Sequence, residues 1–357
     1  MTSSPRPLLA PKFGLSPGFW AMLWRAAIWL GALHLALQLL LMVPALCSRT
    51  DRLRDVAVYY DALQRMMRGV NVYQPWPSYG VQMTPFRFFY SPTFLLLLRP
   101  FAGLDFLTFA RVWSCLLLVP FWVYAFSLSR LTTGKWDVKV ALVFGLAIEF
   151  LRGYASISLG QFEPWMWMLF GLALTVGGRA GWLALATLVK IHPLWSLGLA
   201  LTQDKRAWKS ALLFALPVLA ASWWLVGTRN WAMWWPATSP VASQGTFNAD
   251  NWSLSFFGLR VLNWLGLLKA SGALPAGAKL WLSLCAVCGP LGVMWWARRG
   301  SNELRLALVA CAGVLCAPIC WTLYFPLFLL PLAVWLGERF PQVAPMSAAK
   351  AVFKGGA

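Results

Sequence analysis

Long apolar stretches alternate with short polar turns over nearly the whole chain. A helix needs about 20 apolar residues to cross a hydrocarbon core of about 30 Å. The expected membrane spans lie near 20–46, 105–130, 138–153, 163–178, 208–227, 276–297, 303–319 and 321–337. The pattern therefore predicts an all-α polytopic membrane protein.

The apolar stretch 180–203 differs from the others because cations expected inside flank both of its ends. Lys190, His192 and Pro193 stand at its centre. Irregular backbone at membrane depth has to line a cavity or pack within protein. We therefore expect a broken helical hairpin with these three residues at its outer tip. With this hairpin, the chain has about ten membrane segments.

Cations in the short turns set the orientation, because cytoplasmic turns carry an excess of lysine and arginine. The amino terminus is expected inside, with residues 1–18 as a disordered cytoplasmic tail and 341–357 as a second one. One membrane domain, 19–340, lies between them. Its two large outer regions are 47–104 and 228–275.

Composition excludes a soluble domain, because 60% of the residues are hydrophobic and 11% are charged, against about 25% charged in soluble domains. The net charge is +19. Its cations lie mainly in turns beside apolar runs, where orientation and anionic headgroups account for them. The expected partners are membrane lipids, and no nucleic acid is expected.

The outer region 47–104 carries two predicted interfacial helices. Its first apolar stripe recurs at helical spacing through Val56, Tyr60, Leu63, Met67 and Val70. Such a helix would lie on the outer membrane surface with this face toward lipid, and Gly69 would end it. A second short helix is expected after Pro92.

Region 47–104 also gathers charge where charge is costly. Its cations are all arginines, which suit phosphate oxygens because the guanidinium presents a planar fork of donors. Asp61 is placed four residues before Arg65 and is expected to pair with it. Asp55 fits either an N-cap of the first helix or a chemical role.

Several motifs recur in the order found in one enzyme family. The matching residues are Asp55, Tyr59, Tyr60, Gly69, Tyr73, Phe89, Tyr90, Pro92, Pro100, Gly160, Gln161, Lys190, His192, Pro193, Asn251, Trp252, Leu254, Arg260, Ala317, Pro318 and Trp321. This pattern resembles glycosyltransferase family 87, membrane enzymes of the GT-C fold that use polyprenyl-phosphate sugars. The chain departs from the family at Thr322, Leu323 and Tyr324, where a polar pair such as Asp-His is common.

The resemblance implies a GT-C-type bundle and an inverting transfer from a polyprenyl-phosphate sugar to a glycan or lipid-linked acceptor. The sugar would be a mannose-like hexose or a pentose. The active site would face outward from a bacterial cytoplasmic membrane. Asp55 would be the base. Arg87, Lys190 and Arg260 would bind the donor phosphate. Sugar or acceptor contacts would come from Tyr60, Tyr90, Gln161, His192, Asn251 and Trp321. No metal and no other cofactor is expected, because the donor has one phosphate and the carboxylates do not cluster as a hard cation requires.

Other readings of the same residues stay open. His192 fits a hydrogen-bonded core histidine as well as a ligand to phosphate or sugar, and Arg260 fits a cation that snorkels to the interface. A transporter or flippase of a lipid-linked saccharide would also show charge and a broken helix in the membrane. A non-catalytic lipid-binding scaffold is a third possibility.

Overall fold

The computed structural model describes residues 17–42, 54–73, 88–244, 250–268 and 274–340. Arg87 and nearly all of the two expected terminal tails lie outside these residues. The elements are α1 (Pro17–Leu37), a π-helical turn (Gln38–Met42), α3 (Arg54–Met67), α4 (Pro92–Leu98), η2 (Arg99–Phe101), α5 (Phe106–Leu116), α6 (Leu118–Thr133), α7 (Val138–Phe150), α8 (Gly153–Leu159), α9 (Glu163–Thr175), α10 (Arg179–Val189), α11 (Leu194–Gln203), α12 (Ala207–Val226), α13 (Thr228–Gln244), α14 (Leu254–Trp264), α15 (Ala276–Trp296), η3 (Ala297–Arg299), α16 (Asn302–Leu315), η4 (Thr322–Phe328) and α17 (Leu329–Arg339).

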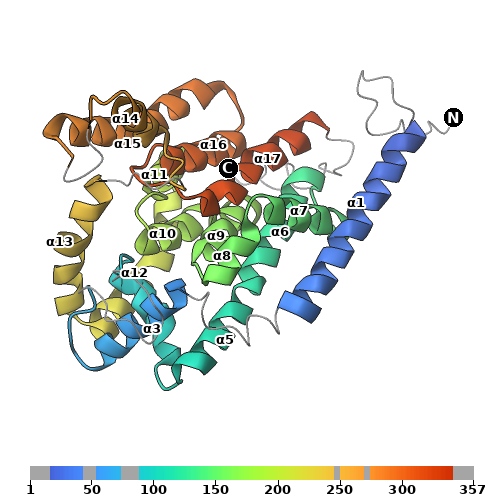
Figure 1. Cartoon of the computed structure of the whole chain (residues 1–357). Coiled ribbons are helices and arrows are strands. Elements are labelled where there is room, and N and C mark those ends of the chain that lie inside the picture. The colour runs from blue at the N-terminus through green and yellow to red at the C-terminus, as the bar shows by residue number, and fades with distance from the viewer. Residues whose placement is uncertain (1–16, 43–53, 74–87, 245–249, 269–273, 341–357) are drawn as a thin grey trace.

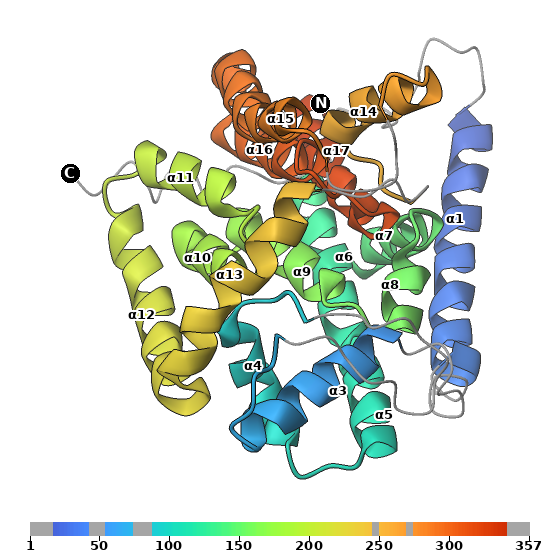
Figure 2. The same cartoon turned by 60° about the vertical axis from the view of Figure 1, so that its left-hand side comes forward.

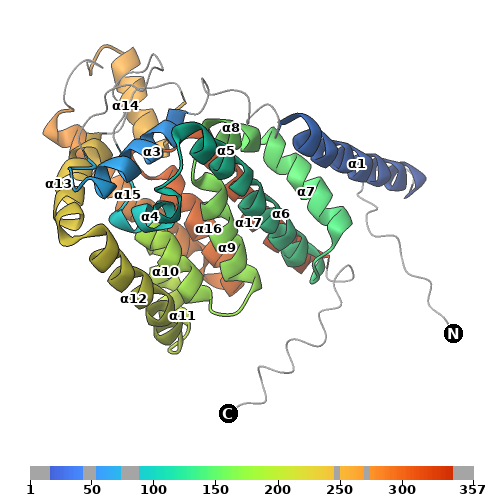
Figure 3. The same ribbon diagram turned by 90° about the horizontal axis from the view of Figure 1, so that it is seen from below.

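The helices form one bundle in which α9 packs between α6 and α10 (Figure 1). Helix α1 stands at the edge of the bundle and packs on α7. The short helices α3, α4 and α5 lie together beneath the central helices (Figure 2). Seen from below, α3 and α14 both lie on the side of the bundle opposite the turn between α11 and α12 (Figure 3). Along that side they lie at opposite edges, with α14 at the top and α3 at the bottom of Figure 1.

The expected all-helical membrane architecture is confirmed, but the expected count of about ten spans is not. Within the described ranges, four helical segments are long and apolar enough to cross a membrane, and they are Gly18–Leu41, Phe106–Thr133, Ala207–Val226 and Ala276–Arg299. Helices α7 and α8 meet at a bend of 70° and would make a fifth if they form one broken span. The runs expected at 163–178 and 303–319 form helices of only 13 and 14 residues, because turns divide the apolar sequence.

The predicted break in the run 180–203 is confirmed. Helix α10 ends at Val189 and α11 begins at Leu194, and the two helices pack against each other. Lys190 has an extended backbone conformation. Proline disfavours helical backbone in the residue before it and has no N–H of its own, so Pro193 suits the start of a new helix. Lys190 and His192 therefore stand in a turn between two packed helices.

Helix α3 is where the pattern predicts it, but its apolar side contacts protein. Val56, Tyr59, Leu63 and Met66 are buried, and α3 packs on α4, α5 and α8. Met67, which was assigned to the lipid-facing stripe, is 52% exposed. The predicted stripe is therefore divided: its first half packs against protein, and its carboxyl-terminal end is exposed. Periodicity shows that one side of a helix is covered, but it does not show what covers that side.

A close approach of two backbones fixes α3 against the turn between α8 and α9. Gly160 ends α8 in the left-handed region, at φ +73°. A Cβ on this residue would lie 1.9 Å from Cγ2 of Val56. The indole N–H of Trp113 donates to the Gly160 carbonyl oxygen at 2.8 Å. Only glycine fits both the dihedral angle and the contact, so Gly160 sets how near Gln161 comes to Asp55.

Replacing Gly160 by alanine should destabilise the protein by about 2 to 4 kcal/mol, because the new methyl group meets Val56 and the left-handed backbone is strained. Gly198→Ala is the matched control. Gly198 lies in α11, where an added Cβ meets nothing within 4 Å, and its effect should stay below about 1 kcal/mol. Denaturant unfolding of both variants in detergent micelles measures the difference. Equal midpoints for the two variants would contradict the packing role of Gly160.

Candidate functional site

Several segments far apart in the sequence bring polar side chains together at the carboxyl end of α10. They are α3, the segment before α4, the α8–α9 turn, the α10–α11 turn and η4. We call this set the Lys190 network; its members are Asp55, Tyr59, Tyr90, Gln161, Glu163, Lys190, His192 and Tyr324. The network is embedded in the main hydrophobic cluster of the bundle.

Lys190 is the centre of this network. Its Nζ lies 2.5 Å from Oε1 of Glu163 and donates to the Tyr324 hydroxyl oxygen at 2.9 Å. The same atom lies 4.8 Å from the ring centroid of Tyr90 and 5.0 Å from that of Tyr324. The Lys190 side chain is 16% exposed and that of Glu163 is 1% exposed. A charge this deeply buried is tolerated only when it is paired and hydrogen-bonded.

Helix α4 holds the end of α10 that carries Lys190. The last carbonyl groups of a helix have no partner within it. Here the hydroxyl groups of Ser91 and Thr93 both contact the Leu188 carbonyl oxygen. The Ser91 backbone N–H also donates to the Val189 carbonyl oxygen at 3.5 Å. These contacts satisfy the end of α10 and fix the position from which Lys190 projects.

Asp55 lies in the first turn of α3, which begins at Arg54. It is therefore inside the helix, where a carboxylate is favoured by the positive end of the helix dipole. The amide Nε2 of Gln161 donates to Oδ2 of Asp55, across 106 residues of sequence. The backbone N–H of Gln161 in turn donates to the Ser156 carbonyl oxygen at 2.8 Å. Gln161 thus holds the Asp55 carboxylate from a fixed turn.

Two tyrosines connect the Asp55 side of the network to Lys190. The Tyr59 hydroxyl donates to the Tyr90 hydroxyl oxygen at 3.0 Å, and the rings meet edge-on at 5.4 Å. Burial raises the pKa of Tyr59 well above its ordinary value, and the nearby carboxylates Asp55 and Glu163 raise it further. Burial, with Glu163, likewise raises the pKa of Tyr90. Both phenols therefore keep their protons and act as hydrogen-bond donors at neutral pH.

The structure brings together Asp55, Tyr90, Gln161, Lys190 and His192 of the predicted site. Tyr60 lies elsewhere, because its hydroxyl donates to the Leu104 carbonyl oxygen at 3.1 Å and its ring packs on Phe106 and Phe109. Tyr59 occupies the site in its place. Residues four apart share a helix face, so the spacing from Asp55 already favours position 59 over position 60.

Asn251 and Trp321 form a neighbouring structure that supports the segment before η4. They pair in a single antiparallel bridge. The Asn251 amide donates to the Pro318 carbonyl oxygen at 3.1 Å and accepts from the Cys320 backbone N–H at 2.8 Å. Trp321 directly precedes η4, whose third residue is Tyr324. Arg260 lies further along, on α14, and Arg87 is outside the described residues.

Sequence reasoning gave no site role to Glu163, although it is the charge partner of Lys190. It noted Tyr324 only as the residue at a departure from the family motif. The sequence did offer one indication of a role for Glu163. The chain has only 11 carboxylates in all, and this one stands in an apolar region at the start of a helix, where a charge needs a partner. The predicted pairing of Asp61 with Arg65 is confirmed, with Oδ2 and Nε 2.6 Å apart, but the two side chains are largely buried and not at the surface as expected.

Among the described residues, no group of three or more His, Cys, Asp or Glu side chains could hold a metal ion. The expected absence of a metal stays a prediction. The polar groups of the site are instead an ion pair, an amide, an imidazole and phenols. Such groups bind and orient an anionic or hydroxyl-bearing substrate.

The fold and the site together define a helical membrane protein with a buried charged network at one end of its bundle. The model of glycosyltransferase family 87 matches residues 88–318, more than half of the chain, and the chain belongs to this family. The matched segment contains Tyr90, Gln161, Glu163, Lys190 and His192, and it begins after Asp55. Comparison with curated proteins and with solved structures gave no match.

Replacing Lys190 alone should destabilise the protein more than replacing Lys190 and Glu163 together. Lys190→Met leaves a buried carboxylate uncompensated and should lower the free energy of unfolding by about 3 to 5 kcal/mol. The double variant Lys190→Met/Glu163→Gln should recover at least half of that loss. Denaturant unfolding in detergent measures all three proteins.

Glu303→Gln is the control for this pair. Glu303 is 41% exposed, and its Oε1 lies 2.7 Å from Nη2 of Arg179, so its loss should cost less than about 1 kcal/mol. If the single and double variants at the buried pair are equally destabilised, the charge-pairing account of Lys190 is wrong.

Proposed function

We propose that this protein is an inverting glycosyltransferase that uses a polyprenyl-phosphate sugar as donor and a glycan or lipid-linked acceptor. Membership of family 87 supports the general activity. The observation that carries the finer proposal is the Asp55 carboxylate, held by Gln161 in a network that contains a buried lysine. This transfer needs a base and a cation in one site.

The reaction joins the acceptor oxygen to the anomeric carbon of the sugar. As that bond forms, the bond from the anomeric carbon to the phosphate oxygen breaks, and polyprenyl phosphate leaves with the bonding electron pair. Asp55 takes the proton of the acceptor hydroxyl. A general base of this kind has to come within about 3 Å of the hydroxyl in the productive complex. Attack from the face opposite the phosphate inverts the anomeric centre.

Lys190 is suited to the departing phosphate. An ammonium group has three N–H donors, and Glu163 and Tyr324 each take one. The third can reach a phosphate oxygen. In a buried site this contact is worth more than in water, because the surroundings screen charge weakly. Arg87 and Arg260 stay as further candidates for the phosphate.

The remaining predicted contacts divide by position. Tyr90, Gln161 and His192 belong to the Lys190 network and are proposed to contact sugar or acceptor. Asn251 holds the backbone beside Trp321, so we propose that it acts by positioning Trp321 near the substrate. Tyr60 is the weakest of the set, because its hydroxyl and ring are engaged on the α5 side.

We place the active site on the outer face of a bacterial cytoplasmic membrane. The cation distribution in the turns supports this orientation. In the view from below, α3 and α14 both lie opposite the cation-bearing turn between α11 and α12 (Figure 3), which agrees with two outer regions on the same side. A mannose-like hexose or a pentose is the proposed sugar class.

Asp55→Asn should lower sugar transfer by at least 100-fold, because general base catalysis typically contributes 10²- to 10⁴-fold. The unfolding midpoint should be unchanged, since asparagine can still accept from Gln161. The assay incubates purified protein in lipid nanodiscs with radiolabelled polyprenyl-phosphate hexoses and pentoses, and it quantifies released polyprenyl phosphate.

Asp61→Asn, on the same helix, is the matched control and should keep more than half of the wild-type rate. Wild-type turnover in Asp55→Asn would remove Asp55 from the mechanism. Movement of labelled donor across vesicle membranes without release of polyprenyl phosphate would instead identify a flippase.

Chelation should leave the transfer rate unchanged within about twofold, because the buried lysine supplies the charge that a metal would otherwise supply. The measurement compares initial rates with and without millimolar EDTA after dialysis. Complete loss of activity that returns on addition of Mg²⁺ or Mn²⁺ would overturn the metal-free mechanism.

A further inference from the structure

Two buried polar atoms of the Lys190 network have no hydrogen-bond partner among the described residues. They are Oε2 of Glu163 and Nε2 of His192. A buried polar atom left unpaired destabilises the folded state, and such atoms are uncommon in native proteins. Glu163 is 1% exposed and its other oxygen is bound by Lys190. Its second oxygen therefore offers an acceptor that the protein itself does not use.

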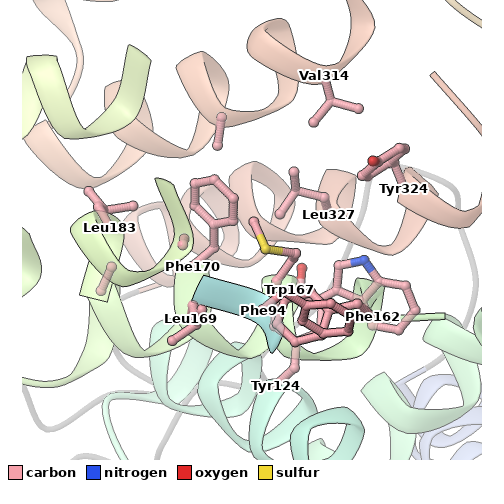
Figure 4. Packing of buried hydrophobic residues seen from close by; sticks show 14 of the residues in the cluster. Phe94, Tyr124, Phe162, Trp167, Leu169, Phe170, Leu183, Val314, Tyr324 and Leu327 are labelled. Atoms are coloured by element: carbon pink, nitrogen blue, oxygen red, sulfur yellow. The ribbon is translucent and has the colours of Figure 1, made fainter. Parts of the chain in front are cut away.

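The two unpaired atoms belong to one small group of side chains. Lys190 contacts both Glu163 and Tyr324, and the rings of Tyr324 and His192 meet edge-on at 5.5 Å. The imidazole also stacks on Phe170, at 6.4 Å between ring centroids. Glu163 and Phe170 lie two turns apart on α9, so they share one face of that helix. Figure 4 shows Phe170 and Tyr324 on the two sides of Leu327 above this helix.

One further donor lies on the same face of α9. The indole Nε1 of Trp167, four residues after Glu163, is also buried without a partner among the described residues. Trp167 lies among the labelled residues of this cluster, near Phe162 (Figure 4). A carboxylate oxygen, an imidazole nitrogen and an indole N–H thus line one apolar and aromatic surface.

Charge decides which ligand fits this surface. The Glu163 carboxylate repels a phosphate oxygen, so a phosphate is drawn to the Lys190 ammonium and not to the unpaired atoms of this group. Its unpaired atoms suit a neutral molecule whose hydroxyl groups donate and accept hydrogen bonds. Aromatic rings beside such groups suit the C–H faces of a sugar ring. Hydroxyl groups of a sugar are therefore the matching chemistry.

We propose that Glu163 is a specificity-determining residue that accepts a hydrogen bond, through Oε2, from a hydroxyl group of the donor sugar. His192 completes the same subsite. This inference rests on the proposed transferase function. The donor sugar is preferred over the acceptor because the sugar is attached to the phosphate that Lys190 is proposed to bind, and Lys190 contacts Glu163 directly.

The test combines Glu163→Gln with donor analogues. Each ring hydroxyl of the sugar that the wild type transfers is replaced in turn by hydrogen or by fluorine, and kcat/KM is measured for both proteins. Fluorine cannot donate a hydrogen bond, so both replacements at the contacted position should lower kcat/KM about 10- to 100-fold in the wild type. In Glu163→Gln the same replacements should cost less than about threefold. Glu303→Gln should behave as the wild type.

The outcomes separate the inference from the function on which it rests. If every replacement has the same effect in both proteins, Glu163 serves only to hold Lys190, and the inference is wrong while the transferase function stands. The same replacements are also made in the acceptor. If kcat/KM differs between the two proteins only for these acceptor analogues, the subsite binds the acceptor and the donor assignment is wrong. If the wild type releases no polyprenyl phosphate from any donor and its tryptophan fluorescence shows no donor binding, the proposed function fails as well.

Discussion

A lysine ammonium held inside an apolar bundle is the constraint on which the rest of the site depends. Lys190 can stay charged there only because Glu163, the Tyr324 hydroxyl and two aromatic rings surround it. These partners come from α9, from η4 and from the segment before α4. The positions of all three around Lys190 are therefore coupled to one charge. Replacing the pair by apolar residues could leave the protein as stable, so its retention fits a functional role better than a purely structural one.

A second constraint fixes the position of the Asp55 carboxylate relative to Lys190. Asp55 comes from α3, whose register along the bundle is set where Gly160 touches Val56. The same turn carries Gln161 and leads directly into Glu163 at the start of α9. One left-handed glycine thus positions both the amide that holds Asp55 and the carboxylate that pairs with Lys190. The positions of Asp55 and Glu163 relative to Lys190 thus depend on a single turn of the backbone.

The network also gives a physical meaning to the departure from the family motif. The expected polar pair is replaced here by Thr322, Leu323 and Tyr324, and Leu323 stands at the position expected for a histidine. Tyr324 follows it, and its hydroxyl accepts from Lys190 while its ring meets His192. The departure therefore still places a hydrogen-bonding group in the network, but that group is a phenol. It lies beside the proposed sugar subsite.

The sequence by itself determined the features that depend on neighbours within one or two helical turns. Helices α3 and α4, the stop at Gly69, the break before Pro193 and the pair of Asp61 with Arg65 all follow from local spacing and local sterics. Tertiary structure decided the rest: Tyr59 in the site in place of Tyr60, the packing of α3 on α4, α5 and α8, and Glu163 as the partner of Lys190. The physical reason is that a helix forms from contacts within four residues. A buried charge finds its partner only when helices distant in sequence pack together.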